Sequence, residues 1–354
     1  MQPRSIPCLR IGFGLTVFAL IASADQITVE WTVTSSQIIP NPPGASFTDA
    51  LGINDQGVVL LDPIPGPIFT TWDGSSFHQY SPPSGFGGAS GVAINNLGVI
   101  AGTAERLNGQ TPTLWYPDGS VVPLAVPGTF PAYALGINNR NQVLISDGQP
   151  LIWDAGVFTS LNGLPGYLLT HAYGINDTGL VAGDVVNSSA GISKPVFWAP
   201  GSQDPTVLPC NGYGTAWAAN NLAEIAGTCG TQAVVWDAAG NMRVIGSGTA
   251  SGINDRGEVV GYDGLNQAFF WSPVYGFTHI TQPNGLGFVT SYAAGIDKNG
   301  VVVASGEPST IIPEPATVGL AALTLLLVFW KHTIRWRAGY SEPSSTRSSL
   351  SDDC

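Results

Sequence analysis

The chain has 354 residues, of which 44% are hydrophobic and only 10% are charged. A helical bundle needs many long charged side chains on its outer faces, so this composition argues against one and favours an all-β protein with many short turns. Residues 25–312 contain 20 acidic and 6 basic side chains. This charge excludes nucleic acid as a partner, because phosphates require a positive surface, and it suits a secreted protein that must stay soluble.

Residues 1–24 are expected to be a secretory signal peptide. Arg4 and Arg10 provide the basic start, residues 11–21 form an apolar run, and small residues precede a cleavage site between Ala24 and Asp25. The alternative is an uncleaved membrane anchor. The run is shorter than the ~20 residues that span a bilayer, so cleavage is favoured.

An internal repeat fills residues 25–310. A short motif of the form Gly-Ile-Asn-Asp-x-Gly-x-Val recurs seven times at steps of 34 to 44 residues. Its central polar residues are Asn54, Asn95, Asn138, Asn176, Asn220, Asn254 and Asp297. A tryptophan follows each of the first six motifs, at Trp72, Trp115, Trp153, Trp198, Trp236 and Trp271. Such a period indicates a repeat architecture.

Each repeat is predicted to contain four short strands. In the sixth, the strands are residues 250–253, 258–261, 268–271 and 277–280, and Asn254 to Gly257 make the first turn. Four strands in about 40 residues are typical of a β-propeller blade. The small residues of the first strand would let the inner strands crowd around the axis. The recurring tryptophan would fill the space between neighbouring blades.

We therefore predict an all-β, seven-bladed propeller. The seventh repeat ends near Glu307 after only two strands, so the strand-like segment Ile27–Ile38 is expected to complete it and join the two ends of the chain. Such a ring leaves no open sheet edge. A six-bladed or open arrangement is the alternative.

Two cysteines remain in the exported part, Cys210 and Cys229. They flank the first two strands of one repeat, and antiparallel strands joined by one turn bring those points to the same end of the sheet. A disulfide is therefore expected, as suits an oxidising compartment. The alternative is two thiols too far apart to bridge.

The motifs for catalysis, metals and cofactors are weak. His78, His171 and His279 stand alone in the sequence, without metal-ligand spacing, and no nucleophile or phosphate-binding motif occurs. We predict no catalytic residue, no metal site and no cofactor. A ring of carboxylates could bind calcium, but a turn-forming role is favoured. The candidate ligands are Asp55, Asp177, Asp255 and Asp297.

Loop aromatics are a further possible binding feature. Tyr80, Tyr116 and Tyr213 could stack on sugars, or they could pack beneath their own loops, which is the favoured interpretation. Glycan cleavage would need a pair of carboxyl groups about 5 to 10 Å apart. The sequence names no such pair.

The C-terminal part is expected to be a membrane and sorting segment. Residues 316–330 are apolar, Pro313, Glu314 and Pro315 precede them, and Lys331, Arg335 and Arg337 follow. The cations belong on the cytoplasmic side, so residues 311–337 are predicted to hold a transmembrane helix. A plain single-pass anchor is one reading of this pattern. Residues 338–354 are predicted to be a disordered tail.

The order Pro-Glu-Pro, apolar helix and basic cluster resembles the bacterial PEP-CTERM sorting signal. This resemblance implies cutting or transfer at Pro313–Pro315 by an exosortase-type transpeptidase and an association with exopolysaccharide. The turn motifs at residues 174–183 and 252–261, with the Ala-Phe-Phe-Trp strand at 268–271, resemble extracellular HAF-type repeats. Ala223 departs from that pattern, because glycine is expected there.

Together these patterns predict an exported cell-surface or matrix protein. The favoured function is a non-catalytic binding or structural module associated with exopolysaccharide or matrix proteins, attached at least transiently to the bacterial envelope. The alternative is a secreted propeller enzyme, a polysaccharide hydrolase or lyase. It would require carboxylates together with a histidine or tyrosine in one central pocket, on one side of an otherwise uniform ring.

Overall fold

The computed structural model describes residues 8–14, 32–45, 47–64, 68–107, 109–127, 131–280 and 288–308. The chain divides into two compact units, Met1–Ser309 and Thr310–Cys354, and all described residues belong to the first. Every regular element among them is a β-strand, so the all-β prediction is confirmed for this part of the chain. None of the described residues belongs to a helix that could cross a membrane.

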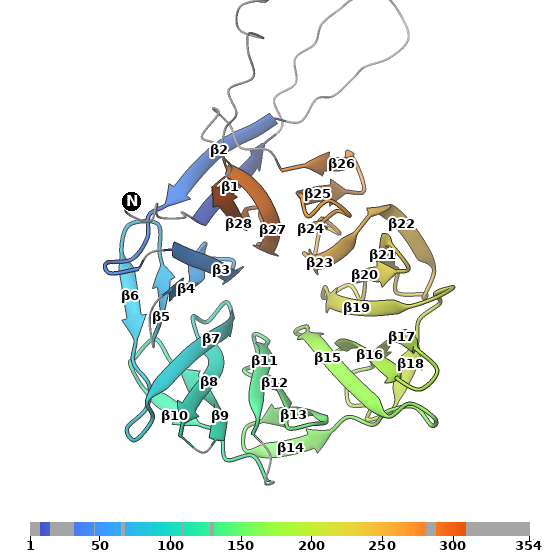
Figure 1. Ribbon diagram of the computed structural model, residues 1–354, viewed down its shortest axis with the longest axis horizontal. Helices are drawn as coiled ribbons and strands as arrows, with labels where there is room; N and C mark the ends of the chain where they lie inside the picture. The colour runs from blue at the N-terminus through green and yellow to red at the C-terminus, as the bar shows by residue number, and fades with distance from the viewer. Residues whose placement is uncertain are drawn as a thin grey trace, which may run out of the picture. The chain divides into compact units, whose positions relative to one another are not determined.

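The fold is a β-propeller with six four-stranded blades arranged around a common axis (Figure 1). Within each blade the four strands follow one another in the chain and pair as antiparallel neighbours. Blade 1 comprises β3 (Phe47–Ile53), β4 (Val59–Ile64), β5 (Phe69–Trp72) and β6 (Phe77–Tyr80); blade 2 comprises β7 (Gly88–Ile94), β8 (Ile100–Arg106), β9 (Gly109–Trp115) and β10 (Val121–Pro123). Blade 3 comprises β11 (Tyr133–Ile137), β12 (Val143–Ser146), β13 (Pro150–Asp154) and β14 (Val157–Ser160); blade 4 comprises β15 (Leu169–Ile175), β16 (Val181–Asn187), β17 (Ile192–Trp198) and β18 (Pro205–Val207). Blade 5 comprises β19 (Gly214–Ala219), β20 (Ile225–Cys229), β21 (Gln232–Trp236) and β22 (Met242–Ser247); blade 6 comprises β23 (Thr249–Ile253), β24 (Val259–Tyr262), β25 (Ala268–Ser272) and β26 (Gly276–His279).

A further four-stranded sheet joins the two ends of the described chain. Its order is β2-β1-β28-β27, with β1 at Cys8–Gly14, β2 at Thr32–Ile39, β27 at Phe288–Ile296 and β28 at Val302–Pro308. The expected strand 27–38 is thus found from Thr32 onward, and its first residues lie outside the described part. Strand β1 lies inside the segment predicted to be a signal peptide. The existence of this sheet in an exported protein therefore depends on what replaces β1.

The turn between the first two strands of each repeat has the geometry that the motif predicts. In blade 1 the Gly57 N–H donates to the Asn54 carbonyl at 2.9 Å, and Gly57 has a φ of 79°. A side chain is strained in this left-handed region, so glycine suits the position. Ala223, the residue that departs from the pattern, adopts the same conformation with a φ of 60°.

We therefore expect Ala223→Gly to stabilise the protein. Relief of the left-handed strain should exceed the added flexibility of the unfolded chain and leave a gain of about 0.5–1 kcal/mol. Chemical denaturation of the variant measures the effect. Ala238→Gly is the control, because Ala238 is exposed and lies outside the left-handed region. A loss of stability in both variants would contradict the argument.

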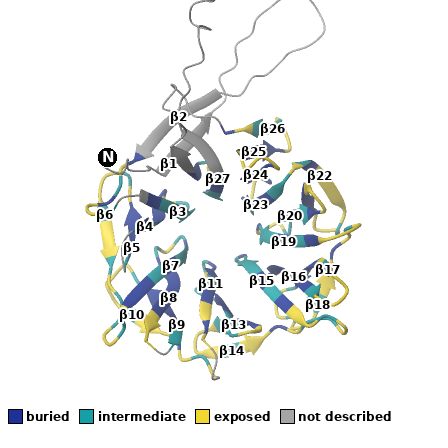
Figure 2. Cartoon of the chain, in the orientation of Figure 1, coloured by how far each residue is buried: buried dark blue, intermediate teal, exposed yellow. Residues whose placement is uncertain are grey.

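The core lies between neighbouring blades rather than inside any one of them. The residue four positions before the motif asparagine, on the first strand of each blade, is small and buried, as in Ala50, Ala172 and Ala216. Figure 2 shows the buried stretches of the blade strands in dark blue. The recurring tryptophans Trp115, Trp198 and Trp236 rank among the largest fully buried side chains. The Nε1–H of each of these three donates to a carbonyl of the preceding blade; the acceptors are Ser81, Asn162 and Pro209 at 2.8–3.0 Å. These three hydrogen bonds therefore link blades 2, 4 and 5 to the blade before each of them.

Candidate functional site

One end of the propeller axis is held together by the asparagines of the repeat motif. Each buried asparagine accepts two backbone N–H groups of its own turn on Oδ1 and donates Nδ2–H to the asparagine or aspartate carbonyl of the next repeat. The interblade bonds are Asn54→Asn95, Asn95→Asn138, Asn138→Asn176, Asn176→Asn220, Asn220→Asn254 and Asn254→Asp297, at 2.6–3.0 Å. We call these bonds the asparagine ring. A buried amide whose donors and acceptors are all paired is stabilising, whereas an unpaired one is costly.

The asparagine ring has one missing bond, at the join between the last repeat and the first. Asp297 accepts the Asn299 and Val301 N–H groups at 2.8 Å, but a carboxylate has no N–H to give to the Asn54 carbonyl.

Asp297→Asn is therefore expected to complete the ring. It should raise the free energy of unfolding by about 1 kcal/mol, because one hydrogen bond is added and a charge is removed from a site that is 3% exposed. Denaturant unfolding of the variant is the measurement. Asp204→Asn, at an exposed aspartate, is the control and should change stability little. A destabilised Asp297→Asn variant would show that the charge itself is needed.

A second set of bonds runs around the same end. The backbone N–H of the residue after each of the first five asparagines donates to the side-chain oxygen at the same position of the next repeat, as in Asp55→Asn96 and Asn139→Asp177, and the Lys298 N–H donates to Asp55. These residues line a cavity of about 220 Å³. The calcium candidates Asp55, Asp177 and Asp255 thus accept backbone and amide N–H groups. In the described part of the chain no group of three or more His, Cys, Asp or Glu side chains could hold a metal.

Toward the other end, each repeat carries a pair of polar residues on its two innermost strands. The pair is adjacent in register and lies five residues before and eight residues after the motif asparagine or aspartate. The pairs are Asp49–Asp62, Ser90–Thr103, Tyr133–Ser146, His171–Asp184, Thr215–Thr228, Thr249–Tyr262 and Tyr292–Ser305. We call them the polar layer. The first strand of every repeat runs toward the asparagine ring. The polar layer, which lies earlier on these strands, is therefore nearer the opposite end of the propeller axis.

Several hydroxyls of the polar layer link neighbouring blades. Ser305 accepts the Ala50 N–H at 3.0 Å, Thr103 accepts the Ala134 N–H at 3.3 Å, and Thr228 donates to Thr249 at 3.2 Å. A neutral Ser or Thr is thus sufficient for the structural task. Blades 1 and 4 depart from this rule: blade 1 places two carboxylates there, Asp49 and Asp62, and blade 4 combines the histidine His171 with the carboxylate Asp184.

Asp184 is the centre of a group that we call the Asp184 cluster: His171, Tyr173, Asp184, Thr215 and Trp217. His171 Nδ1 lies 2.8 Å from Asp184 Oδ1, and the Thr215 hydroxyl donates to Asp184 Oδ2 at 2.9 Å. The Asp184 side chain is 7% exposed, whereas that of His171 is 43% exposed. A carboxylate that holds one imidazole nitrogen leaves the other available to solvent or a ligand.

Two aromatic rings complete the Asp184 cluster. Tyr173 and Trp217 lie on the innermost strands β15 and β19, with ring centroids 4.4 Å apart. Burial raises the pKa of Tyr173 to about 12, and the charge of Asp184 and a hydrogen bond to it act in the same direction. The phenol therefore stays neutral at physiological pH. Each residue occupies the bulge of its first strand; the residues at this position in the seven repeats are Leu51, Val92, Leu135, Tyr173, Trp217, Ser251 and Ala294.

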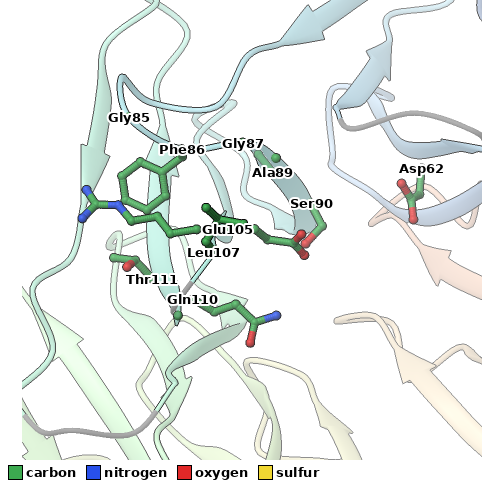
Figure 3. Close-up of a pocket in the computed structure, with 13 residues that line it drawn as sticks. Asp62, Gly85, Phe86, Gly87, Ala89, Ser90, Glu105, Leu107, Gln110 and Thr111 are labelled. Atoms are coloured by element: carbon green, nitrogen blue, oxygen red, sulfur yellow. The ribbon is translucent and has the colours of Figure 1, made fainter.

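A larger cavity of about 1130 Å³ opens beside blades 1 and 2 (Figure 3). Phe86 lines one side with the Arg106 guanidinium 3.8 Å from its ring centroid, and Asp62 lies on the far side. Glu105 and Gln110 lie between them in Figure 3. Burial raises the pKa of Asp62, and the neighbouring charge of Asp49 raises it further. The cavity is therefore lined both by the cation–π pair of Arg106 and Phe86 and by the carboxylates of Asp62 and Glu105.

The raised pKa of Asp62 predicts a pH-dependent stability. The folded state disfavours the ionised carboxylate, so the contribution of Asp62 to stability should rise as the pH falls through its folded pKa, and Asp62→Asn should stabilise the protein at pH 7. The gain should be about a few tenths of a kcal/mol, since solvent screens this half-buried group. Unfolding at pH 7 and pH 3 measures it. Equal gains at both pH values would contradict the charge argument.

The other sequence candidates have separate places. His78 pairs with Asp73 at an exposed turn, and His279 pairs with Asp263 at 2.9 Å. Tyr80 is the last residue of β6 and stacks on Phe69 of the neighbouring strand β5, with centroids 5.1 Å apart. The remaining two tyrosines differ from each other: Tyr116 packs against the core beside blade 3, and Tyr213 is 63% exposed.

Cys210 and Cys229 are joined by a disulfide whose Cα atoms are 5.6 Å apart. Cys229 is the last residue of β20, and Cys210 precedes β19. The cleavage residues Ala24 and Asp25 and the sorting residues Pro313, Glu314 and Pro315 lie outside the described residues, as does the predicted transmembrane helix.

Sequence reasoning missed the Asp184 cluster. His171 stands alone in the sequence because its partner Asp184 lies 13 residues further along the chain, and Thr215, which donates to the same carboxylate, lies 31 residues beyond Asp184. The signal was nevertheless present. When the repeats are superposed on their motif asparagines, the fourth and fifth carry the only adjacent aromatic residues at the bulge position.

No protein-family model matches the sequence, and a comparison with curated proteins finds no match. Solved structures do resemble it. A catalytically inactive virginiamycin B lyase from Staphylococcus aureus, solved with quinupristin, is 10% identical, with a TM-score of 0.52 over 76% of this chain and 98% of its own. A streptogramin B lyase is 12% identical, with a TM-score of 0.51 over 73% and 93% of the two chains. At these identities the likeness shows the propeller fold alone.

Proposed function

We propose that this protein is an exported, non-catalytic propeller that binds exopolysaccharide at the Asp184 cluster. The Tyr173–Trp217 pair carries the proposal. Sugar rings present apolar C–H faces and polar edges, and binding sites combine aromatic faces with a few placed polar groups. The Asp184 cluster supplies both, because hydroxyl and imidazole groups adjoin the two rings. No other neighbouring blades in the described ring carry aromatic residues at the bulge.

Export and sorting belong to the same proposal. Residues 1–24 would be removed between Ala24 and Asp25, and Pro313–Pro315 would be recognised by an exosortase-type transpeptidase in the manner of PEP-CTERM proteins with HAF-type repeats. Residues 316–330 would anchor the chain at least transiently. The Cys210–Cys229 disulfide supports this, since such bonds persist outside the cytoplasm. The destination would be the cell surface or the extracellular matrix.

The seventh blade is also part of the proposal. Val303 packs with Ala50, Val59 and Trp72 of blade 1, and Val302 packs with Val260 of blade 6. Strands β27 and β28 thus touch both neighbours, which supports a ring of seven blades with the seventh shared between the two chain ends.

The test is to incubate the exported protein with the producer's own exopolysaccharide and to measure co-sedimentation and polymer length together. We expect binding with unchanged polymer length. Absence of binding would overturn the proposal and leave a protein partner as the remaining reading.

A second candidate function is a polysaccharide hydrolase or lyase, and the Asp184 cluster favours it. It brings a carboxylate, a histidine and a tyrosine together on one side of the ring, the arrangement that the enzyme alternative required. Shortening of the polymer by the wild-type protein, abolished by His171→Asn, would establish this function instead. His78→Asn, at the exposed Asp73 pair, is the matched control and should leave any shortening unchanged.

A further inference from the structure

The six blades share a rule for the register of their second and third strands, and the sheet that joins the chain ends does not follow it. In each blade the tryptophan of the third strand is the register partner of the first residue of the second strand. The pairs are Val59–Trp72, Ile100–Trp115, Val143–Trp153, Val181–Trp198, Ile225–Trp236 and Val259–Trp271. In the joining sheet, the first residue of β28 is Val302, and its partner is Ile11 of β1. The rule is broken there by a strand from the predicted signal peptide.

The chain holds a tryptophan that would obey the rule. Trp31 lies 23 residues before Asn54. The corresponding distances from Trp72, Trp115 and Trp153 to the next motif asparagine are also 23 residues each, and those from Trp198, Trp236 and Trp271 to the next motif residue are 22, 18 and 26. Trp31 is therefore placed in the sequence as the tryptophan of a blade that precedes blade 1.

The flanking residues agree with this placement. Eight to ten residues after the tryptophan, where the fourth strand ends, most blades have a buried aliphatic residue: Leu124, Leu161, Leu208, Ile245 and Ile280. Eight residues after Trp31 stands Ile39, which is 0% exposed. The residue two before the tryptophan is buried in every blade, and Val29 suits that position. Glu30 is the one departure from the apolar pattern.

Blade 1 shows independently that its neighbour is incomplete. In blades 2, 4 and 5 the tryptophan Nε1–H donates to a carbonyl one or two residues past the end of the preceding fourth strand. For Trp72 the corresponding residue is Pro40, directly after Ile39, the last residue of β2. The Trp72 Nε1 is instead buried without a hydrogen-bond partner, in a side chain whose residue is 7% exposed. An unpaired buried donor is costly, which favours a different arrangement of the joining sheet.

We propose that removal of residues 1–24 vacates the place of β1 and that the segment Ile27–Trp31 takes it, with Trp31 beside Val302 and with residues 32–35 forming the turn to residues 36–39 of β2. Maturation then exchanges one strand of the joining sheet for another and places the Pro40 carbonyl within reach of Trp72. The proposal rests on the proposed export, since it concerns the chain that begins at Asp25.

The experiment compares the chain that begins at Asp25 with the chain that begins at Met1. In the shorter chain we expect the amides of Val29 to Trp31 and the Trp72 indole N–H to be protected from hydrogen exchange at least about 100-fold. Trp31→Ala should lower the melting temperature of the shorter chain by about 5 °C or more. The same substitution should leave the longer chain nearly unchanged, because β1 then occupies the place.

If the Val29–Trp31 amides exchange hydrogen at the rate of an unstructured chain, the proposed replacement of β1 is wrong. An unchanged melting temperature for Trp31→Ala in the shorter chain would also show that it is wrong. So would protection that appears only on dimerisation, because a second copy would then fill the place. The mass of the exported protein tests the signal peptide separately. A mature chain that still begins at Met1 would refute the proposed export, while the behaviour of the chain from Asp25 would still decide the strand exchange.

Discussion

Asn95→Ala is expected to lower the free energy of unfolding by about 3–4 kcal/mol. The Asn95 side chain is 4% exposed and accepts the Leu97 and Val99 N–H groups at 3.0 and 2.9 Å. Its Nδ2 donates to the Asn138 carbonyl and to the Asn141 side chain. Alanine would leave these groups unpaired in a site that water reaches poorly. The turn of blade 2 and its bond to blade 3 would be lost together.

Denaturant unfolding measures this loss, with Asn241→Ala as the matched control. Asn241 is exposed, and its side chain donates only to Asp237, so the control should change stability by less than about 0.5 kcal/mol. Asn95→Asp is informative as well. It keeps both acceptor bonds of the turn but cannot donate to blade 3, so its loss should fall between the two. A loss under about 1 kcal/mol for Asn95→Ala would show that the asparagine ring contributes little.

Trp217→Ala is expected to weaken exopolysaccharide binding by about 30-fold, which corresponds to about 2 kcal/mol. Removal of the indole takes away one of the two rings of the Tyr173–Trp217 pair, and Tyr173 alone presents a smaller apolar face. Stability should fall less than for a buried tryptophan, because the Trp217 side chain is only partly buried and its Nε1–H makes one long bond, 3.3 Å, to Thr228.

Quantitative co-sedimentation over a range of polymer concentrations measures the effect. Tyr275→Ala is the control, since Tyr275 lies on the outer hairpin of blade 6 between β25 and β26, far along the sheet from the polar layer. Trp217→Phe should retain most of the affinity if ring stacking is the cause. Equal affinity of Trp217→Ala and wild type would remove the Asp184 cluster as the binding site.

The repeat and its strands could be predicted from the sequence because they depend on residues close together in the chain. For the sixth repeat the expected strands coincide within one residue with β23 to β26. The turn role of Asn254 and Gly257 followed from their conformational preferences in the same way. Strand and turn signals are local, and the motif occurs seven times. The regular repeats therefore indicate the strands of the less regular ones.

The interblade bonds and the Asp184 cluster could not be predicted in this way. Asn95 bonds to a carbonyl 43 residues away, and Tyr173 meets a ring 44 residues away. These contacts exist only after the blades are set side by side. The motif also drew attention to what the repeats share, whereas a binding site depends on where one repeat differs. His171 and Asp184 are such differences, since Ser and Thr hold these positions in blade 2.

The join between β28 and blade 1 has a consequence for the order of folding. A chain synthesised from its N-terminus presents blades 1 to 6 in turn, and each can form from contacts within about 40 residues of sequence. Blade 1, however, packs Ala50 and Trp72 against Val303, which arrives roughly 250 residues later. One apolar side of blade 1 therefore waits uncovered until the last strands emerge. Between the formation of blade 1 and the arrival of β28, this uncovered apolar side is open to aggregation.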